Sequence, residues 1–312
     1  MPEQIGSEGR KIIANDLNWY FFDHINKADL DLVGDKFGFH KLDLSDCLAP
    51  TERPKIDVYD NYLFLVLQFP ERNKETGAIK ISEVDIFLGK NYLVTFNRGN
   101  RKLAKLFNKL GSDQSLRNEY TNDGCGVFLY RIIKYIFEES IPLLDALSDQ
   151  IHHLEKEIFE DGEPGTISRV KEIAKIKKDL IIFQTIIEPQ RIHYQYLGQK
   201  QSQLTGENLS KYFTDLASLI ESMNVSIIHH RHLLDVIEDA NETVISNNTN
   251  NVIKTLTFFS VFMMPLTLVS GIYGMNIALP FSSHPWAFAL VIGVMILVTG
   301  IMLVYFRKNK LL

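Results

Sequence analysis

The sequence is poor in cysteine and has no excess of basic residues. Its 312 residues include two cysteines, Cys47 and Cys125, and neither belongs to a Cys-x-x-Cys pair. A disulfide framework and a structural zinc site are therefore not expected. Acidic residues outnumber basic ones, 38 against 33, so the basic face that nucleic-acid binding needs is missing. We expect no nucleic-acid partner.

Several catalytic and targeting signals are also absent. The sequence has no Gly-x-x-x-x-Gly-Lys-Ser/Thr nucleotide loop and no His-Glu-x-x-His zinc-protease motif. We therefore predict a protein that is not an enzyme and that binds no organic cofactor. The first 15 residues lack an apolar core of signal-peptide length, so the first 250 residues are expected to stay in the cytoplasm.

Acidic residues stop at Glu242. The 70 residues after it contain no Asp or Glu and only four basic residues, Lys254, Arg307, Lys308 and Lys310. An acidic body is thus followed by an apolar, weakly basic tail.

The first third of the chain has the pattern of a mixed α/β domain. Segment 56–69 is rich in β-branched and aromatic residues and stops at Pro70. Segments 78–88 and 91–97 are two further short runs typical of strands. Residues 100–110 then predict a short amphipathic helix that ends at Gly111.

From about Gly126 the spacing of apolar residues becomes helical. Two runs repeat at intervals of 3, 4, 3 and 4, as in a coiled-coil seam, and predict two antiparallel helices separated by a break at 161–165. Pro189 should end or bend the second helix. The runs are Leu144, Leu147, Ile151, Leu154 and Ile158, and Ile173, Ile176, Leu180, Phe183 and Ile187.

A longer helix follows. The 58 residues between Gly206 and Pro265 contain neither glycine nor proline. This run predicts one continuous helix of roughly 87 Å, at 1.5 Å per residue.

Two uncharged segments in the tail are long enough to cross a bilayer. Segment 255–273 would form a helix of about 28 Å, close to the ~30 Å hydrocarbon core, and segment 286–306 is longer. By the positive-inside rule, the basic residues after the second segment lie in the cytoplasm. We expect a multi-pass protein of the cell (inner) membrane with both termini in the cytoplasm. The predicted parts are a cytoplasmic α/β domain (1–120), a long-helix funnel (121–254) and a membrane part (255–312) with a short outer loop (274–285).

Two helices per chain cannot enclose an aqueous path, so a channel would have to form from several copies. The first membrane segment carries the polar residues, whereas the second is almost purely apolar and suits contact with lipid. One face of the first helix has a continuous stripe at intervals of 3 and 4 residues, which predicts the pore-lining face. The stripe consists of Asn250, Ile253, Thr257, Ser260, Met264, Thr267 and Gly271.

The first segment ends in Tyr273-Gly274-Met275-Asn276. The run from Met264 to Asn276, the segment 53–63 and the long helices resemble the CorA family of magnesium transporters, of the two-span, Gly-x-Asn type. This resemblance covers most of the chain. It implies an α+β membrane protein with an N-terminal α/β/α cytoplasmic domain, a long helical coiled-coil funnel and two C-terminal transmembrane helices, assembled as a homopentamer.

The resemblance also implies a function, passive uptake of Mg²⁺, with Co²⁺ and Ni²⁺ as further candidate ions. Backbone and amide oxygens of Gly274, Met275 and Asn276 would hold the hydrated ion, because Mg²⁺ prefers oxygen ligands and sheds water reluctantly. Asn250 would lie at the cytoplasmic mouth of the pore. The apolar constriction, which gates by dewetting, would consist of Ile253, Leu256 and Met264.

Family members are closed by Mg²⁺ bound between their cytoplasmic domains, so Mg²⁺ is expected as cargo and as regulator. Asp239 matches the regulatory acid about ten residues before the Asn-rich mouth, within a cluster that also holds Asp235, Glu238 and Glu242. Its partner acid is harder to place, because no Asp or Glu occurs between Asp85 and Asp113.

Two alternatives stay open. A zinc transporter of the same superfamily could be argued from the histidines, although we predict solvated or interhelical side chains because helix-surface His pairs lack convergent geometry. A membrane-anchored coiled-coil scaffold or sensor would explain the long helices but not the stripe. The preference among Mg²⁺, Co²⁺, Ni²⁺ and Zn²⁺ and the direction of transport are not fixed by the sequence. The histidines concerned are His152, His153, His229, His230 and His232.

Overall fold

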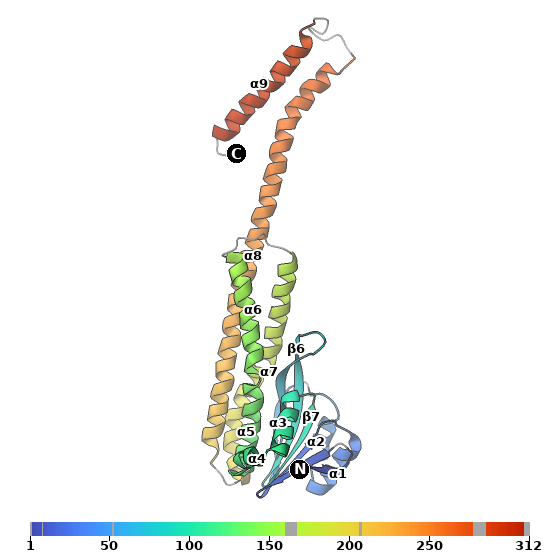
Figure 1. Cartoon of the computed structure of the whole chain (residues 1–312), viewed down its shortest axis with the longest axis vertical. Coiled ribbons are helices and arrows are strands. Elements are labelled where there is room, and N and C mark those ends of the chain that lie inside the picture. The colour runs from blue at the N-terminus through green and yellow to red at the C-terminus, as the bar shows by residue number, and fades with distance from the viewer. Residues whose placement is uncertain are drawn as a thin grey trace. The chain divides into compact units, whose positions relative to one another are not determined.

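The computed structural model describes residues 2–7, 9–51, 53–159, 167–205, 208–276 and 285–308 (Figure 1). The strands are β1 (Glu3–Ile5), β2 (Gly9–Ala14), β3 (Leu17–Phe22), β4 (Lys55–Val58), β5 (Tyr62–Arg72), β6 (Ile79–Gly89) and β7 (Tyr92–Arg98). The helices are α1 (Lys27–Phe37), α2 (Lys41–Asp46), α3 (Arg101–Ser112), α4 (Gln114–Thr121), α5 (Gly124–Glu138), α6 (Ile141–Phe159), α7 (Ile167–Thr205), α8 (Ser210–Tyr273) and α9 (Ala287–Lys308).

The described residues divide into two compact units, one up to Asp239 and one from Ala240 onward. The first unit holds the sheet, the helices around it and the N-terminal part of α8. The second holds the remainder of α8 together with α9. The three-part division expected from the sequence, with boundaries at 120 and 254, stays a prediction.

The seven described strands form one mixed sheet in the order β1-β2-β3-β7-β6-β5-β4. Only β3 and β7 pair in parallel, and the other neighbours are antiparallel. The hairpin between β5 and β6 closes where the N–H of Asn73 donates to the carbonyl of Ala78, at 2.9 Å. Gly77 has a φ of 70° there, a left-handed conformation that glycine adopts without strain.

The sequence pattern of 56–69 was misleading in two ways. The segment is two antiparallel strands, β4 and β5, joined by a tight turn in which the N–H of Tyr59 donates to the carbonyl of Tyr62 at 3.0 Å. The second strand also continues through Pro70 to Arg72. Pro70 is tolerated because β4 pairs with β5 only as far as Val66, so the missing N–H faces an edge without a strand.

Helices cover both faces of the sheet, which confirms the predicted α/β/α domain. On one face, α1 and α2 pack over an aromatic cluster in which the rings of Phe39 and Phe87 stack at 4.0 Å. On the other face, Trp19 of β3 contacts Phe107 of α3 and Phe128 of α5, with ring centroids 4.8 and 5.3 Å apart. Strands β1 to β3 and helices α1, α2 and α4 were not identified from the sequence.

The long helices follow the predicted pattern. All ten residues of the two apolar seams are buried, in α6 and α7. Helix α7 does not end at Pro189 but continues to Thr205. Helix α8 runs without interruption for 64 residues and includes Pro265, so the expected continuous rod is confirmed.

Candidate ion pathway along α8

In the second unit, α8 and α9 pack through aromatic side chains. Phe306 of α9 lies against Phe258 and Phe262 of α8, with ring centroids 5.3 and 5.6 Å apart. Both helices are long and apolar enough to cross a membrane. The contact with α9 thus occupies one defined side of α8.

The predicted stripe lies on another side of α8. Each residue turns a helix by about 100°, which places the stripe roughly opposite Phe258 and Phe262. Its apolar members are uncovered in the single chain, and Met264 is 76% exposed. Leu256 is not part of the stripe but belongs to the predicted constriction, and it is 64% exposed. Apolar side chains of α8 outside the stripe are open as well, among them Phe259 and Leu268 at 65% and 63%, so the surface of α8 away from α9 is available to lipid or to other copies.

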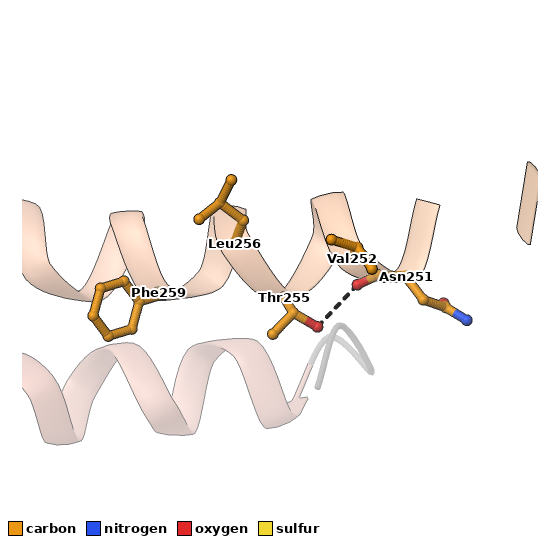
Figure 2. A pocket seen from close by; sticks show the side chains of 5 residues that line it. All are labelled: Asn251, Val252, Thr255, Leu256 and Phe259. Carbon is orange, nitrogen blue, oxygen red and sulfur yellow. Dashed lines mark hydrogen bonds between the residues drawn. The ribbon is translucent and has the colours of Figure 1, made fainter. Parts of the chain in front are cut away.

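Several stripe residues share one shallow groove. Ser260, Met264, Thr267 and Gly271 line it together with Met275 of the predicted selectivity site. Leu256 lies in a second shallow groove with Asn251, Val252, Thr255 and Phe259 (Figure 2). Asn250, Ile253 and Thr257 are exposed on the same helix.

The hydroxyl groups of the stripe donate back to their own helix. Thr257, Ser260 and Thr267 donate to the carbonyls of Ile253, Leu256 and Met263, at 2.8, 2.9 and 2.8 Å. Figure 2 shows the same arrangement at Thr255, which donates to Asn251. Each hydroxyl proton is thereby used, and the oxygen keeps a lone pair as an acceptor. Such acceptors suit the water shell of a hydrated cation, because the water molecules on a cation donate outward.

Helix α8 ends at Tyr273, directly before Gly274-Met275-Asn276. The N–H of Gly274 still donates to the carbonyl of Ser270, at 2.9 Å. A Cβ atom at Gly274 would lie only 3.1 Å from that carbonyl oxygen. Met275 and Asn276 follow outside the helix and are exposed. The last carbonyls of a helix lack intrahelical partners, so oxygen acceptors gather at this end.

The acids near the start of the stripe differ in their surroundings. Asp239 is exposed and continues the stripe at the same spacing through Thr243 and Ser246 to Asn250. Asp235 and Glu238 instead pair with Lys177 of α7, at 3.0 and 2.6 Å. Within the described ranges, no group of three or more His, Cys, Asp or Glu residues is arranged to hold a metal ion.

Where the structure describes them, no three of these histidines are arranged to hold a metal ion. His153 is exposed, 3.5 Å from Glu157 on its own helix. His229 and His232 are exposed on α8, whereas His230 is buried against α6. These positions agree with the predicted solvated and interhelical roles.

The architecture is that of a membrane protein in which a large α/β/α domain and long helices precede two helices long and apolar enough to cross a membrane. The chain belongs to the CorA family, because residues 14–308 match the model described as CorA-like Mg²⁺ transporter protein. It is 29% identical over 302 residues to the cobalt/magnesium transport protein CorA of Thermotoga maritima, covering 94% of this chain and 82% of that protein.

Two solved structures share the fold. The complete CorA structure from Methanocaldococcus jannaschii matches with a TM-score of 0.79 and 22% identity, covering 94% of this chain and 90% of that one. The full-length CmaX structure matches with a TM-score of 0.74 and 17% identity, covering 95% and 88%. At these identities the matches establish the fold, which agrees with the fold class expected from the sequence.

Proposed function

We propose that the protein is a divalent-cation channel for passive uptake of Mg²⁺, with Co²⁺ and Ni²⁺ as further candidate ions. The observation that carries this proposal is the uncovered stripe of α8 that leads to Gly274-Met275-Asn276. Family membership and the printed name of the Thermotoga maritima relative support the choice of ion.

The channel is a homopentamer in this proposal, because two helices per chain cannot enclose a pore. One side of α8 packs against α9, so the stripe is left to face the other copies and the axis. Helix α9 then lies outside, against the lipid bilayer. Residues 1–120 and 121–254 form the cytoplasmic domain and funnel, and residues 255–312 form the membrane part, in the inner membrane with both termini in the cytoplasm.

Gly274, Met275 and Asn276 form the outer selectivity site. Five copies provide a ring of neutral oxygen acceptors that holds a hydrated Mg²⁺ ion without removing its water. Five helix C-termini also place roughly −2.5 charges there, at about −0.5 per helix. The outer loop contains no Asp or Glu, so in this proposal the helix dipoles supply the negative potential at the outer mouth.

The remainder of the stripe forms the conduction path. Ile253, Leu256 and Met264 form apolar rings that close the pore by dewetting. Thr257, Ser260, Thr267 and Gly271 provide the wettable parts between and beyond these rings, and Asn250 lines the cytoplasmic mouth. Inward movement of a divalent ion across 100 mV releases about 4.6 kcal/mol, so the membrane potential alone drives uptake.

The test is ion flux into liposomes that contain the purified protein, with Mg²⁺, Co²⁺, Ni²⁺ and Zn²⁺ measured separately. We expect Mg²⁺ flux that follows the membrane potential and does not need a pH gradient. Flux of Zn²⁺ alone, dependent on a pH gradient, would instead identify a zinc transporter. Absence of flux for all four ions would favour a membrane-anchored scaffold. Native mass measurement of the same preparation should give a pentamer.

A further inference from the structure

A buried histidine connects α6 to α8. His230 of α8 is 8% exposed, and its Nε2 lies 3.0 Å from the hydroxyl oxygen of Ser148 on α6. Its Nδ1 lies 3.5 Å from the hydroxyl of Ser226, one turn earlier on α8. Residues 82 positions apart in the sequence thus meet through one imidazole ring.

A second histidine leaves the hydroxyl proton of Ser148 free for this hydrogen bond. The Nδ1 of His152 lies 2.8 Å from the backbone carbonyl of Ser148 and 3.4 Å from its hydroxyl oxygen. A carbonyl only accepts, so the Nδ1 of His152 carries the proton and donates to it. The hydroxyl proton of Ser148 is then available for the Nε2 of His230, which accepts it in the neutral tautomer that carries its proton on Nδ1, toward Ser226.

Protonation of His230 reverses this hydrogen bond and places a charge on a ring that is 8% exposed. An imidazolium ring donates from both nitrogens, so the hydroxyl of Ser148 would have to turn and accept instead. Burial lowers the pKa of His230, and the neighbouring His229 and His152 lower it further, whereas Asp145 of α6 raises it. On the α7 side, Arg231 donates to the amide of Gln184. The surroundings of the ring therefore favour its neutral form.

The sign of the pH effect follows from the lowered pKa. The unfolded or separated state takes up a proton at a higher pH than the packed state does. The contact is therefore fully present above the ordinary histidine pKa of about 6.5 and weakens as the pH falls below it.

We propose that His230, Ser148 and His152 form a proton-sensitive latch between α6 and α8, closed when His230 is neutral and opened when it is protonated. The latch acts on the helix that also carries Asn250 and Met264, because α8 is one helix from Ser210 to Tyr273. On the proposed function, acidification of the cytoplasm then changes ion flux through the pore.

The primary test is hydrogen–deuterium exchange of the full-length protein in detergent, from pH 7.5 to pH 5.5, with rates corrected for intrinsic exchange. Peptides around Ser148 and His230 should lose protection as the pH falls, by up to about tenfold per pH unit for one proton. His230→Gln should remove this dependence, because the amide does not titrate. His153→Gln, which alters an exposed histidine on α6, should behave like the wild type.

A second variant keeps the test decisive if His230→Gln fails to fold. Ser148→Ala removes the hydroxyl partner and should lower protection at pH 7.5, with a smaller change on acidification. The latch is refuted by equal protection of the wild type at pH 7.5 and 5.5. It is equally refuted if His230→Gln or Ser148→Ala retains the full pH response.

Flux provides a separate readout. In liposomes, Mg²⁺ flux of the wild type should change several-fold when the pH at the cytoplasmic face falls from 7.5 to 5.5, and that of His230→Gln should not. If no variant conducts any ion, the proposed function fails, and the exchange experiment still decides the latch. If the wild type conducts Mg²⁺ equally at pH 7.5 and pH 5.5, the latch has no influence on the pore.

Discussion

The carboxyl group of Asp85 lies beside the guanidinium of Arg98 inside the sheet without a hydrogen bond to it. The Oδ2 of Asp85 is 3.8 Å from the Nε of Arg98, whereas the Oε1 of Glu83 is 3.0 Å from the same nitrogen. Neither oxygen of Asp85 has a hydrogen-bond partner among the described residues, and the side chain is 0% exposed. Two carboxyl groups therefore compete for one cation.

This arrangement predicts that stability falls as the pH rises. The pKa of Asp85 is raised to about 8, mainly by burial; the nearby charge of Glu83 also raises it, by more than Arg98 lowers it. Between the ordinary value of about 3.9 and that value, the folded protein keeps a proton that the unfolded chain has lost. Because of Asp85, the free energy of unfolding should thus fall by up to about 1.4 kcal/mol for each unit by which the pH rises in this range.

Asp85→Asn should therefore flatten the pH dependence of thermal unfolding between pH 5 and pH 8. The measurement is the unfolding temperature of the purified protein in detergent, followed by circular dichroism. Asp57→Asn, which alters a half-exposed acid paired with Lys55 at 2.7 Å, is the control and should keep the wild-type slope. The same slope in Asp85→Asn would show that Asp85 is ionised throughout.

A second prediction concerns the edge of the sheet. Beyond the end of β4, the backbone N–H and carbonyl of Gln68 are bound by the side chain of Gln190, at 3.3 and 2.7 Å. The side-chain amide of Gln190 thus makes the two hydrogen bonds that a neighbouring strand would otherwise make with Gln68. Gln190→Leu would leave two buried backbone groups unpaired and should cost about 1–3 kcal/mol. The unfolding temperature should drop by several degrees, whereas Gln150→Leu, whose amide bonds to its own helix at Ala146, should change it little.

A third prediction concerns the outer site. Asn276→Ala should abolish Mg²⁺ flux and leave the oligomer intact, because it removes a ring of amide oxygens but no packing contact of α8. Flux assays and native mass measurement check the two parts. Asn248→Ala, on α8 but outside the stripe, should conduct normally. Undiminished Mg²⁺ uptake by Asn276→Ala would rule out this residue as a selectivity determinant.

The last prediction concerns regulation through Asp239. The family resemblance implies a regulatory Mg²⁺ near Asp239. Asp239→Lys supplies a fixed positive charge there and should hold the channel closed at low internal Mg²⁺. The measurement is flux against internal Mg²⁺ for the wild type and the variant. Glu242→Lys, at another exposed acid on α8, should retain the wild-type curve. Identical, Mg²⁺-independent curves for wild type and Asp239→Lys would show that feedback is absent.

The sequence predicted the long helices well because their signal is local. An apolar seam at helical spacing and a long run without glycine or proline are both visible in single windows, and α6, α7 and α8 follow them. The strands were harder, because a strand buried on both faces loses its alternation. Residues Tyr62 to Glu71 are all buried, so no alternation marked where this strand begins or its passage through Pro70. The local signal for the turn before it was Asp60-Asn61, two residue types that favour turns.

The candidate site likewise has features with a local sequence signal and features without one. The stripe could be found from its spacing along one helix, and it lies on a side of α8 that α9 does not cover. The contacts of His230 with Ser148 and of Gln190 with Gln68 join residues 82 and 122 positions apart, so no local pattern could predict them. Roles that need several copies of the chain, such as the oxygen ring at Asn276, depend on geometry that one chain does not contain.

The unbroken course of α8 makes the number of its residues as important as their identity. Inserting one residue between His230 and Met264 would rotate everything beyond it by about 100° and shift it by 1.5 Å. On the proposed function, the latch would keep its orientation, while Met264 would turn away from the pore axis. Only insertions near a whole number of turns, such as seven or eleven residues, restore the angular phase. Helix length in this segment should therefore change in such steps or not at all.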